Sequence, residues 1–392
     1  MAKEEKKAPK LRFNGYTNDW EHVKPKKYLK ISKVPGSNGL IAKKLTVKLW
    51  GKGVVEKDTT FNGSENTKYF TRKSGQLMYG KLDFLHAAFG IVPQNLNNYE
   101  STADSPAFDI NDVGDRIFLI NYFLRPEFYL KNGEKANGSR KAKRIHEETF
   151  LNMPMQAPIK SEQEKIAKTL NSLNNTIQLH EDHLQFLHSF KSFLLQKMFF
   201  DNDIPPLLRF NKFTEKWNQC RLNDHTIVTM GQSPNSKNYT NNQTGKILVQ
   251  GNADLYKNKV LKRVFTTEVT KTAVKNDILI SVRAPVGDIA RNQYESVVIG
   301  RGIASIKGND FLYYQLEKMK NNGFWNKYIA GSTFESITGK DLKNTKIYTT
   351  NSDEERKIGN IFSSLTKIIQ LQEHKIDSLK KLKQFLLQNM FI

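Results

Sequence analysis

The sequence predicts an α+β protein in which two globular α/β domains are joined by an antiparallel two-helix coiled coil, with a pseudo-twofold internal repeat. The first observation is a forty-residue stretch that occurs twice, at 161–200 and 353–392, with 17 of the 40 aligned positions identical and no gap. The second is a shared opening pattern, LRFNGYTNDW at 11–20 and LRFNKFTEKW at 208–217. The third is that the segments between these repeats mix short β-type runs with Asn-Gly turn dipeptides.

The repeats divide the chain into five parts. We expect a disordered basic arm at 1–10, a globular domain at 11–160, a long helix at 161–200, a second globular domain at 201–352 and a second long helix at 353–392. Within the globular domains, β-type runs lie at 45–50, 76–82, 246–250 and 277–282, and helical patterns lie at 117–124 and 311–320.

Each copy of the forty-residue stretch carries a seam of apolar residues whose spacing alternates between four and three. That spacing is the heptad pattern of a coiled coil, so the two matched helices most simply pair with each other. Polar residues interrupt both seams at equivalent places, His180 with Gln372 and Lys191 with Lys383. The predicted pairing residues are Ile166, Leu173, Ile177, Leu184, Leu187, Ile358, Leu365, Ile369, Ile376 and Leu379.

Chain connectivity indicates the direction of the pairing. The first helix leads into the second globular domain, and the second helix starts from that domain, so it packs along the first only by running back. We therefore expect the two ends of the chain to lie near each other. A capping-box pattern, Ser161 with Glu164 and Ser352 with Glu355, predicts where each helix starts.

The charge predicts a polyanionic partner. The chain has 61 basic and 39 acidic residues, a net charge of +22. Nucleic acid is favoured over a membrane surface because no apolar run approaches the length of about 18 residues that a spanning helix needs. A single cysteine, Cys220, excludes an internal disulfide, and the charged start MAKEEKKAPK is unlike a signal peptide, so a cytoplasmic location is expected.

Catalytic motifs are absent from the sequence. It contains no G-x-x-x-x-G-K-[ST] phosphate loop and no C-x-x-C pair, and Asp277–Arg283 lacks the acidic-x-Lys pattern of a metal-dependent nuclease. We therefore expect no catalytic residue, no metal and no cofactor in this chain.

Basic and amide side chains near predicted turns are the candidates for contact with DNA. Arg, Lys, Asn and Gln donate to phosphates and to base edges. The predicted DNA-binding residues are Lys43, Lys44, Lys68, Arg72, Lys73, Lys81, Arg140, Lys141, Arg144, Gln232, Ser233, Lys237, Gln250, Asn252, Arg263, Arg283 and Arg301.

Several stretches carry a resemblance to one protein family over essentially the whole chain. In the globular domains they are Gly75–Asp83, Asp104–Ile110, Gly231–Pro234, Val249–Asn252, Asn276–Asp288 and Ile299–Gly302. With the start of each long helix, Gln163–Ile166 and Glu355–Ile358, which is similar to the family's conserved helix, they resemble the specificity subunits of Type I restriction-modification systems. The first domain lacks the Arg-Ala-Pro-Val-Gly run of the second, so the two loops need not contact DNA alike.

The resemblance implies a non-catalytic subunit. Each globular domain would be a target recognition domain that reads one half of a bipartite sequence in double-stranded DNA, and the paired helices would fix the spacing between the halves. Two modification subunits, which carry S-adenosylmethionine and methylate adenine, would dock on this chain. Two restriction subunits, which are ATP-driven motors with a Mg-dependent nuclease, would join through them.

Two other function classes stay open. The chain could be a non-catalytic coiled-coil scaffold that joins two protein-binding or RNA-binding domains, or a self-sufficient nuclease. Salt distinguishes the scaffold from a DNA reader, since binding through phosphates weakens steeply as the salt concentration rises. Incubation with Mg²⁺ and plasmid DNA tests the nuclease, and we expect no cleavage.

Overall fold

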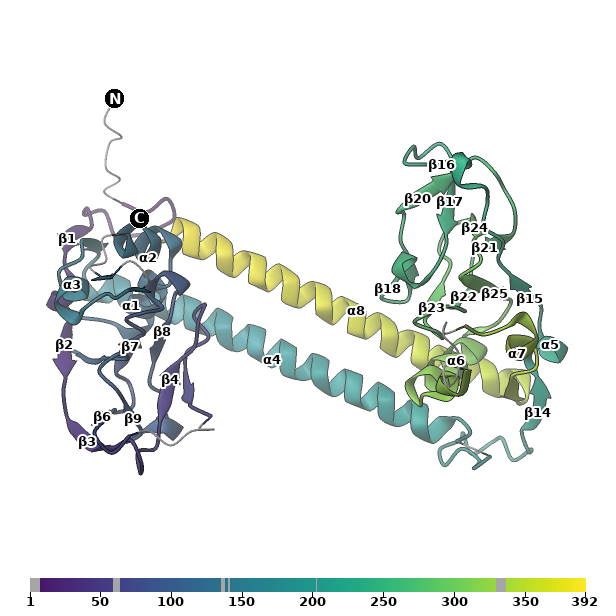
Figure 1. Ribbon diagram of the computed structural model, residues 1–392, viewed down its shortest axis with the longest axis horizontal. Coiled ribbons are helices and arrows are strands. Elements are labelled where there is room, and N and C mark those ends of the chain that lie inside the picture. The colour runs from purple at the N-terminus through teal and green to yellow at the C-terminus, as the bar shows by residue number, and fades with distance from the viewer. Residues whose placement is uncertain (1–7, 59–63, 135–137, 140–141, 202, 329–335) are drawn as a thin grey trace. The chain divides into compact units, whose positions relative to one another are not determined.

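The computed structural model describes residues 8–58, 64–134, 138–139, 142–201, 203–328 and 336–392. It divides into two compact units: unit 1 holds residues 1–181 and 374–392, and unit 2 holds residues 182–373. Each unit contains one globular domain and part of two long helices, α4 (Lys160–Met198) and α8 (Ser352–Asn389), drawn teal and yellow in Figure 1. Most of the predicted arm at 1–10 lies outside the described residues.

The globular domain of unit 1 is built on a four-stranded antiparallel sheet in the order β2-β10-β7-β8. These strands are β2 (Leu29–Ser32), β10 (Ala107–Ile110), β7 (Leu77–Tyr79) and β8 (Phe89–Ile91). Around it lie β3 (Pro35–Asn38), β6 (Lys68–Thr71) and β9 (Glu100–Ser101) in one sheet, the hairpins β4 (Leu45–Val47) with β5 (Val54–Glu56) and β11 (Gly138–Ser139) with β12 (Ala142–Lys143), and helices α1 (Arg116–Phe123), α2 (Pro126–Gly133) and α3 (Glu147–Leu151).

The core of unit 1 is aromatic. Strands β7, β8 and β10 contribute Tyr79, Phe89 and Phe108, which are fully buried, and Phe150 from α3 packs against all three rings. Large rings bury much apolar area per residue. The same core includes Phe391, which follows the end of α8.

The globular domain of unit 2 contains two larger sheets. The first has the order β15-β25-β22-β23-β19-β18 and the second β16-β20-β17-β24-β21. The strands of the first sheet are β15 (Val228–Met230), β25 (Ile303–Ile306), β22 (Ile278–Ser281), β23 (Ile289–Arg291), β19 (Lys259–Val260) and β18 (Leu255–Tyr256). Those of the second are β16 (Tyr239–Thr240), β20 (Val264–Thr266), β17 (Lys246–Val249), β24 (Ser296–Ile299) and β21 (Thr272–Val274), and the helices are α5 (Leu222–His225), α6 (Asp310–Asn321) and α7 (Gly339–Lys343).

The two domains share a strand order. In unit 1 the order β2-β10-β7-β8 places the last of the four strands in sequence beside the first, and β15-β25-β22-β23 does the same in unit 2. Each domain is closed by a short antiparallel ladder of its first and last strands: β1 (Glu21–Val23) pairs with β13 (Met155–Ala157), and β14 (Asn218–Arg221) pairs with β26 (Lys346–Thr349). The prediction of a mixed α/β protein is confirmed, and the pseudo-twofold relation of the two halves stays a prediction.

The predicted elements differ from the observed ones only at their ends. The runs at 45–50, 76–82, 246–250 and 277–282 contain β4, β7, β17 and β22, and the helices at 117–124 and 311–320 are α1 and α6. The strands are shorter than the apolar runs because the flanking residues enter turns, as at Trp50, whose φ is +60°.

The seams of α4 and α8 are buried in both units. In unit 2, Leu187 of α4 packs with Leu365 and Ile369 of α8. In unit 1, Glu181 of α4 forms an ion pair of 2.6 Å with Lys380 of α8. Ile166, Ile177, Leu187, Ile358, Leu365, Ile369 and Ile376 are buried, whereas Leu173, Leu184 and Leu379 are half-buried.

The predicted capping boxes are wrong. Helix α4 begins at Lys160, one residue before Ser161, and Glu164 instead lies 3.8 Å from Lys160. At α8, the backbone N–H of Asp353 donates to the side chain of Asn351, so Asn351 caps the helix and Ser352 is already inside it. Asx side chains cap as well as Ser, and the pattern alone did not decide between neighbouring residues.

A clamp at the start of unit 1 joins both long helices. The guanidinium of Arg12 donates two hydrogen bonds, of 2.7 and 2.8 Å, to the carboxylate of Glu162 in the first turn of α4. The backbone N–H of Leu11 donates to the carbonyl oxygen of Asn389 at the end of α8. The entry segment therefore holds the start of one helix beside the end of the other, which confirms that the two ends of the described chain lie close together.

Unit 2 repeats the clamp with equivalent residues. Arg209 donates two hydrogen bonds, of 2.9 and 2.7 Å, to Glu354 in the first turn of α8, and Leu208 N–H donates to the carbonyl oxygen of Lys197 near the end of α4. Burial alone would raise the pKa of the Glu354 carboxyl, but hydrogen bonds from Arg209 and Thr350 outweigh it, so the pKa is lowered. We call these two arrangements the entry clamps.

Candidate nucleic-acid interface

Four loops of unit 2 converge where its two sheets meet. They are Gly231–Pro234, Gln250–Asn252, Arg283–Pro285 and Gly300–Gly302. Backbone hydrogen bonds tie them together, from Gln232 N–H to Ile299 (2.9 Å), from Gly300 N–H to Val249 (2.8 Å) and from Val282 N–H to Gly302 (2.9 Å). The last loop carries the chain from β24 in one sheet to β25 in the other, so the sheets position all four.

Glycine allows this close approach. A Cβ atom at Gly231 would collide with the carbonyl oxygen of Gly300, and one at Gly302 would collide with that of Gln250. Any other residue at these two positions would push the loops apart, so the glycines of the GQSP and GRG stretches fix the shape of the surface.

The side chains on this surface combine donors with fixed supports. Gln232, Arg283 and Arg301 are exposed, whereas Ser233 uses its hydroxyl oxygen to accept the backbone N–H of Arg301 at 3.1 Å. Half-buried Asn252 donates to Asp288. Arginine and glutamine present paired donors and acceptors that match guanine and adenine edges. The three exposed side chains therefore project from loops that backbone hydrogen bonds hold together.

A carboxylate that the sequence analysis did not single out holds the loop Gln250–Asn252. Asp254 is buried and accepts the backbone N–H of Gln250 at 2.8 Å, and it lies 3.6 Å from Arg263. Arg263 stays 52% exposed at its side chain and donates to the carbonyl of Ala253. Exposed Lys237 lies in the turn that follows Pro234. In the sequence, Asp254 could have been found because it is a carboxylate two residues after the Gly251-Asn252 turn, where it can accept backbone N–H groups of the turn.

In unit 1, four of the predicted DNA-binding residues are exposed: Lys43, Lys68, Lys73 and Arg144. Arg140 and Lys141 lie outside the described residues. DNA contact by the exposed four stays a prediction.

Three predicted DNA-binding residues of unit 1 are instead part of its interior. Arg72 is 1% exposed and donates to the hydroxyl of Ser101 at 2.7 Å and to the carbonyl of Ser32 at 3.1 Å. Burial lowers its pKa to about 10. Lys81 and Lys44 are each 7% exposed, and Lys81 pairs with Glu147 at 2.8 Å. The prediction is corrected for these three residues because they are buried. Arg72 bonds to residues of β9 and β2, Lys81 pairs with a residue of α3, and the ammonium of Lys44 lies 5.8 Å from the centroid of the Tyr69 ring.

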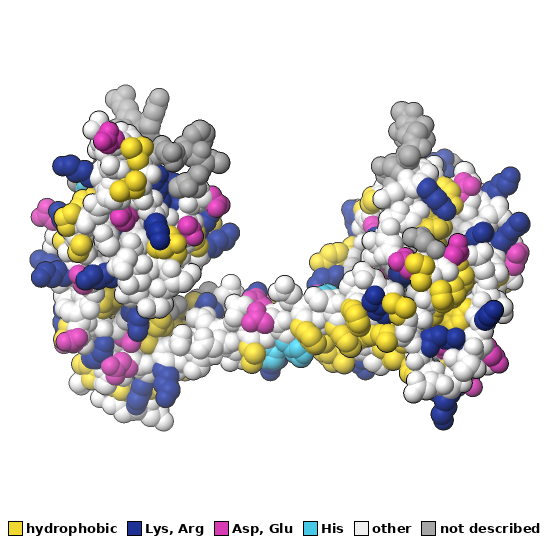
Figure 2. Space-filling model, turned by 90° about the horizontal axis from the view of Figure 1, so that it is seen from below, with side chains coloured by type: hydrophobic (Ala, Val, Ile, Leu, Met, Phe, Trp, Pro, Cys, Tyr) yellow, Lys and Arg dark blue, Asp and Glu magenta, His cyan; other side chains and the backbone are white. Residues whose placement is uncertain are grey.

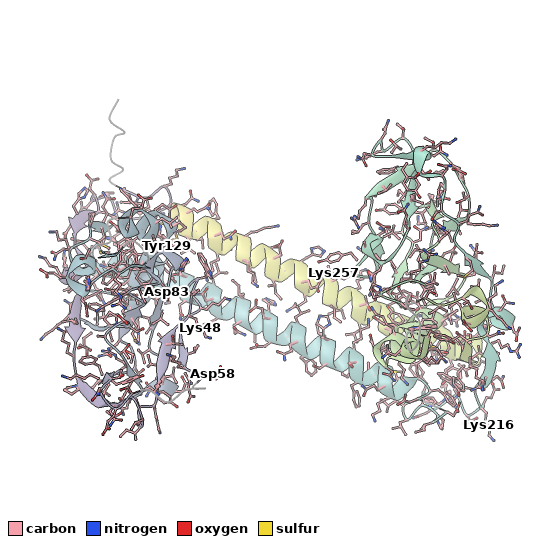
Figure 3. The ribbon with its side chains drawn as sticks, viewed as in Figure 1. Lys48, Asp58, Asp83, Tyr129, Lys216 and Lys257 are labelled. Atoms are coloured by element: carbon pink, nitrogen blue, oxygen red, sulfur yellow. The ribbon has the colours of Figure 1, made fainter. Side chains whose placement is uncertain are left out.

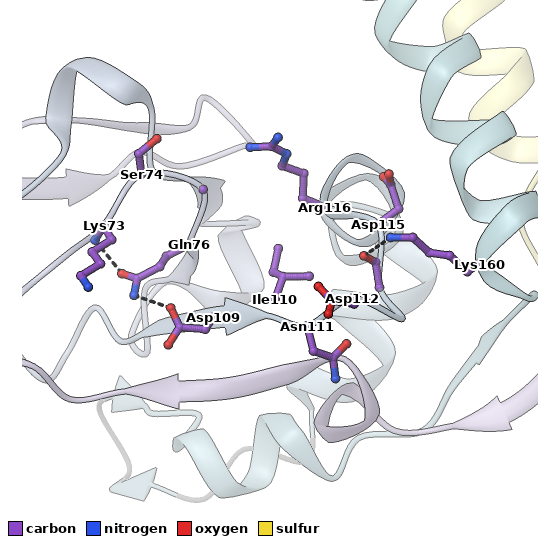
Figure 4. Close-up of a pocket in the computed structure, with 12 residues that line it drawn as sticks. Lys73, Ser74, Gln76, Asp109, Ile110, Asn111, Asp112, Asp115, Arg116 and Lys160 are labelled. Carbon is purple, nitrogen blue, oxygen red and sulfur yellow. Dashed lines mark hydrogen bonds between the residues drawn. The ribbon is translucent and has the colours of Figure 1, made fainter.

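A polar cavity of about 540 Å³ lies in unit 1 beside the start of α4 (Figure 4). It gathers cations and carboxylates alike: the predicted residue Lys73 lines it with Arg116, Lys160, Asp109, Asp112 and Asp115. Gln76 donates to Asp109 at 2.8 Å, and Lys160 donates to the carbonyl of Gly114 at 2.6 Å. Its charges offset one another, so the cavity is not an anion site.

Within the described ranges, no cluster of three or more His, Cys, Asp or Glu residues is arranged to hold a metal ion. In the same ranges, no helix is long and apolar enough to cross a membrane.

Comparisons with known proteins point to one family. Residues 214–381 match the model of the Type I restriction modification DNA specificity domain. A curated relative from Methanocaldococcus jannaschii, named as a putative type I restriction enzyme MjaX specificity subunit, is 28% identical over 284 residues. The alignment covers 68% of this chain and 64% of that relative, so it leaves about a third of the relative unmatched.

Solved structures share the fold. The S subunit of a Type I restriction-modification system from M. genitalium matches with a TM-score of 0.61 at 15% identity, over 98% of this chain and 99% of that one. A chain from a study of assembly and conformational transition of the type I R-M system matches with a TM-score of 0.57 at 20% identity, over 95% and 97%. The matched domain, the curated relative and the shared fold agree: this chain is similar to type I restriction-modification specificity subunits.

Proposed function

We propose that this chain is the DNA-reading subunit of a Type I restriction-modification enzyme, and that each globular domain reads one half of a bipartite target. The observation that carries the proposal is the convergence of Gln232, Arg283 and Arg301 on a rigid loop surface inside the matched DNA specificity domain. Exposed arginine and glutamine side chains on fixed loops suit the donor and acceptor pattern of a major groove. The net charge of +22 suits binding to the phosphate backbone.

The long helices serve as the spacer between the half-sites in this proposal. Their buried seams support a fixed register in each unit, because a one-residue slip would expose Leu187 or Ile369 to water. The entry clamps hold each domain to both helices. A rigid attachment at each domain is what a spacer of defined length requires.

The outer face of the helices is the proposed docking surface for modification subunits. In unit 2, Phe186, Phe190 and Phe193 of α4 remain 62%, 42% and 48% exposed, and Figure 2 shows hydrophobic side chains at the surface of this helical part. In unit 1, Leu382 and Phe385 of α8, which align with Phe190 and Phe193 in the repeat, are 45% and 53% exposed. Exposed apolar surface of this extent marks a protein interface.

The duplication of this face supports two modification subunits, one for each unit, with restriction subunits joining through them. S-adenosylmethionine, ATP and Mg²⁺ would bind to those partner subunits. The chain itself would contribute no catalytic residue.

Adenine methylation in cells tests the function. The chain is expressed with the modification subunit encoded beside it, and the methylated sites are found by single-molecule sequencing. We expect a bipartite methylated motif that is absent when this chain is omitted. A soluble, associated pair of subunits that adds no methylation would contradict the proposal and would favour the scaffold.

The docking face has its own test. Phe190→Glu with Phe193→Glu should abolish co-purification with the modification subunit and lower the melting temperature by only a few degrees, because 42% and 48% of these residues' surface is already exposed to water. A matched control, Gln185→Glu with Gln196→Glu, places the same charges at exposed polar positions of α4. Retained co-purification of the phenylalanine variant would exclude this face.

A further inference from the structure

The hairpin of β4 and β5 displays the one tryptophan that is not buried. The chain has four tryptophans, and Trp20, Trp217 and Trp325 are 2%, 8% and 2% exposed. Trp50 is 60% exposed. A ring of this size left in water is unusual in a folded domain, because it forgoes a large area of apolar burial.

The backbone at Trp50 is held in a left-handed conformation by specific contacts. Its φ is +60°, and that of Gly51 is +66°. Trp50 N–H donates to the carbonyl of His86 at 2.7 Å, and Gly51 N–H donates to that of Ala87 at 2.9 Å. The indole meets the ring of His86 edge-on, with centroids 5.5 Å apart. A bulky residue in this backbone region is strained, so the fold fixes the turn while it leaves the ring outside.

The loop around Trp50 is basic. Its residues, Lys48 to Gly53, include two exposed lysines, Lys48 and Lys52, and no acidic residue. Figure 3 labels Lys48 on this hairpin. An aromatic ring flanked by lysines is the combination that contacts nucleic acid, since the ring stacks on bases or sugars while the ammonium groups bind phosphates.

Unit 2 carries a counterpart at its β18–β19 hairpin. Tyr256 is 59% exposed, and the two turn residues that follow it, Lys257 and Asn258, have φ of +45° and +63°. Arg291 N–H donates to the carbonyl of Asn258, which fixes the turn to β23. Lys257 pairs with Glu373 of α8 at 2.8 Å, and it is labelled beside that helix in Figure 3.

The hairpins occupy matched places in the two domains. The first is fixed to the connection between β7 and β8, and β5 lies so close to β8 that a Cβ at Gly90 would contact Val54 at 2.9 Å. The second pairs through β19 with β23, the strand that follows β22 as β8 follows β7. Two unlike sequences, KLWGKG and YKNK, thus present an exposed aromatic ring with lysines at the same position of the fold.

We propose that Trp50 and Tyr256 are DNA-contacting residues, each pressing its ring against the bases or sugars of double-stranded DNA beside the half-site that its own domain reads. The inference rests on the proposed DNA-reading function and adds residues outside the predicted polar set. The exposed lysines Lys48 and Lys52 beside Trp50, and Lys259 near Tyr256, supply the phosphate contacts that hold each ring in place, since Lys257 is already paired with Glu373. A modification subunit that covers Trp50 is the competing occupant, and the test separates the two.

Tryptophan fluorescence reports on Trp50 directly because the other three indoles are buried. With the full chain, we expect acrylamide to quench an exposed component that is missing from Trp50→Phe. Mixed-sequence duplex DNA should protect this component from acrylamide, and fluorescence anisotropy of a fluorescein-labelled duplex measures the binding in the same samples. Binding without protection would overturn the inference and leave the DNA-reading function standing, whereas no binding by the wild type would remove both. Protection by the modification subunit alone, without DNA, would assign Trp50 to the protein interface instead.

Substitutions give the second readout. Trp50→Ala and Tyr256→Ala should each weaken binding of the labelled duplex about tenfold, and Trp50→Phe should weaken it by about twofold, because a smaller ring still stacks. The matched control is Val113→Ala, an exposed apolar position (49%) in the turn before α1, which should change the affinity by less than twofold. Equal affinities for Trp50→Ala and the wild type, at a salt concentration where both bind, would contradict the proposal.

Discussion

Glu162 and Glu354 accept equivalent hydrogen bonds in the two units. Each carboxylate is fully buried in the first turn of a long helix, and each receives two hydrogen bonds from the arginine of an LRFN motif. One difference separates them: the indole N–H of Trp217 also donates to Glu354 at 3.1 Å, whereas that of Trp20 has no partner in the described structure. In the unit 2 clamp the buried indole N–H therefore has a hydrogen-bond partner, whereas in the unit 1 clamp it has none in the described structure.

Replacement of Glu354 by Gln should destabilise unit 2 by about 3 kcal/mol at pH 7, because it leaves Arg209 without its charged partner. The pKa of Glu354 is lowered in the folded state, so its stabilisation is complete above the unfolded value of about 4.3 and is lost as the pH falls through the folded pKa. The difference in the free energy of unfolding between the wild type and Glu354→Gln, measured by urea unfolding, should thus become smaller below about pH 4. Asp353→Asn, at an exposed pair on the same turn, should cost less than about 1 kcal/mol.

Lys191 and Lys383 are equivalent in the repeat but differ in their partners. Lys191 is buried and pairs with Glu317 at 2.8 Å. Lys383 is half-buried, forms no ion pair with any described residue, and has its pKa lowered by burial and by Lys380. Lys191→Leu should lower the melting temperature, because it leaves the carboxylate of Glu317 without its ion-pair partner. Lys383→Leu should raise the melting temperature, because it removes a half-buried charge that forms no ion pair with a described residue.

The pH dependence sharpens this contrast. A lysine whose folded pKa is lowered penalises the folded state while it is charged, and the penalty disappears as the pH rises through that pKa. The advantage of Lys383→Leu, followed by thermal unfolding, should therefore be largest near neutral pH and shrink toward pH 10. A constant advantage across this range would mean that packing, and not charge, sets the effect.

At the residue scale, the sequence did not show which basic residues are exposed and which are buried. Arg72 and Lys81 lie near predicted turns, as the exposed basic residues also do. Their partners, Ser101 and Glu147, lie 29 and 66 residues away in the sequence. Burial of this kind depends on which strands pair, which the local sequence does not contain. The loops around Gln232 and Arg301 were predictable because glycine marks their close approach.

At the scale of elements, the long helices were the most predictable part of the chain. A seam repeated over forty residues specifies a helix, its buried face and a partner of matching pattern, all from local sequence. The helix starts were missed by one residue because Asn351 competes with Ser352 for the capping position. Of the two small hairpins only β4 was predicted, and the exposure of Trp50 and Tyr256 was not, since these rings resemble core residues when only their apolar character is considered.

A charge in the seam tests the helix pair. Leu187 is 7% exposed between Leu365 and Ile369, and Leu187→Asp should destabilise unit 2 by several kcal/mol, about 3 or more, because the carboxylate has no partner there. Gln185→Asp, two residues earlier and exposed, controls for the change in helix propensity. Wild-type urea unfolding of Leu187→Asp would argue against a packed seam.

At the scale of the whole molecule, the β-ladders that close each globular domain should allow that domain to be replaced by the corresponding domain of a relative. β1 pairs with β13 and β14 pairs with β26, so the entry and exit of each globular domain lie side by side. Replacing residues 21–157 by the corresponding segment of a relative should change one half of the methylated motif and leave the other half and the gap unaltered. Sequencing of methylated sites checks this, and a change in both halves would contradict independent reading by the two domains.

Synthesis of the chain from its first residue completes the two units at different times. Phe391 stacks on Phe118 with centroids 5.3 Å apart and meets Trp20 edge-on, and Asn389 accepts the hydrogen bond of Leu11. The core of the first domain therefore needs the end of α8 and the residues that follow it. Unit 2 ends at Glu373 and contains all of its own parts by then. On the ribosome the domain that emerges first is therefore the last to close, and its unfinished aromatic core stays exposed to chaperones and proteases for most of translation.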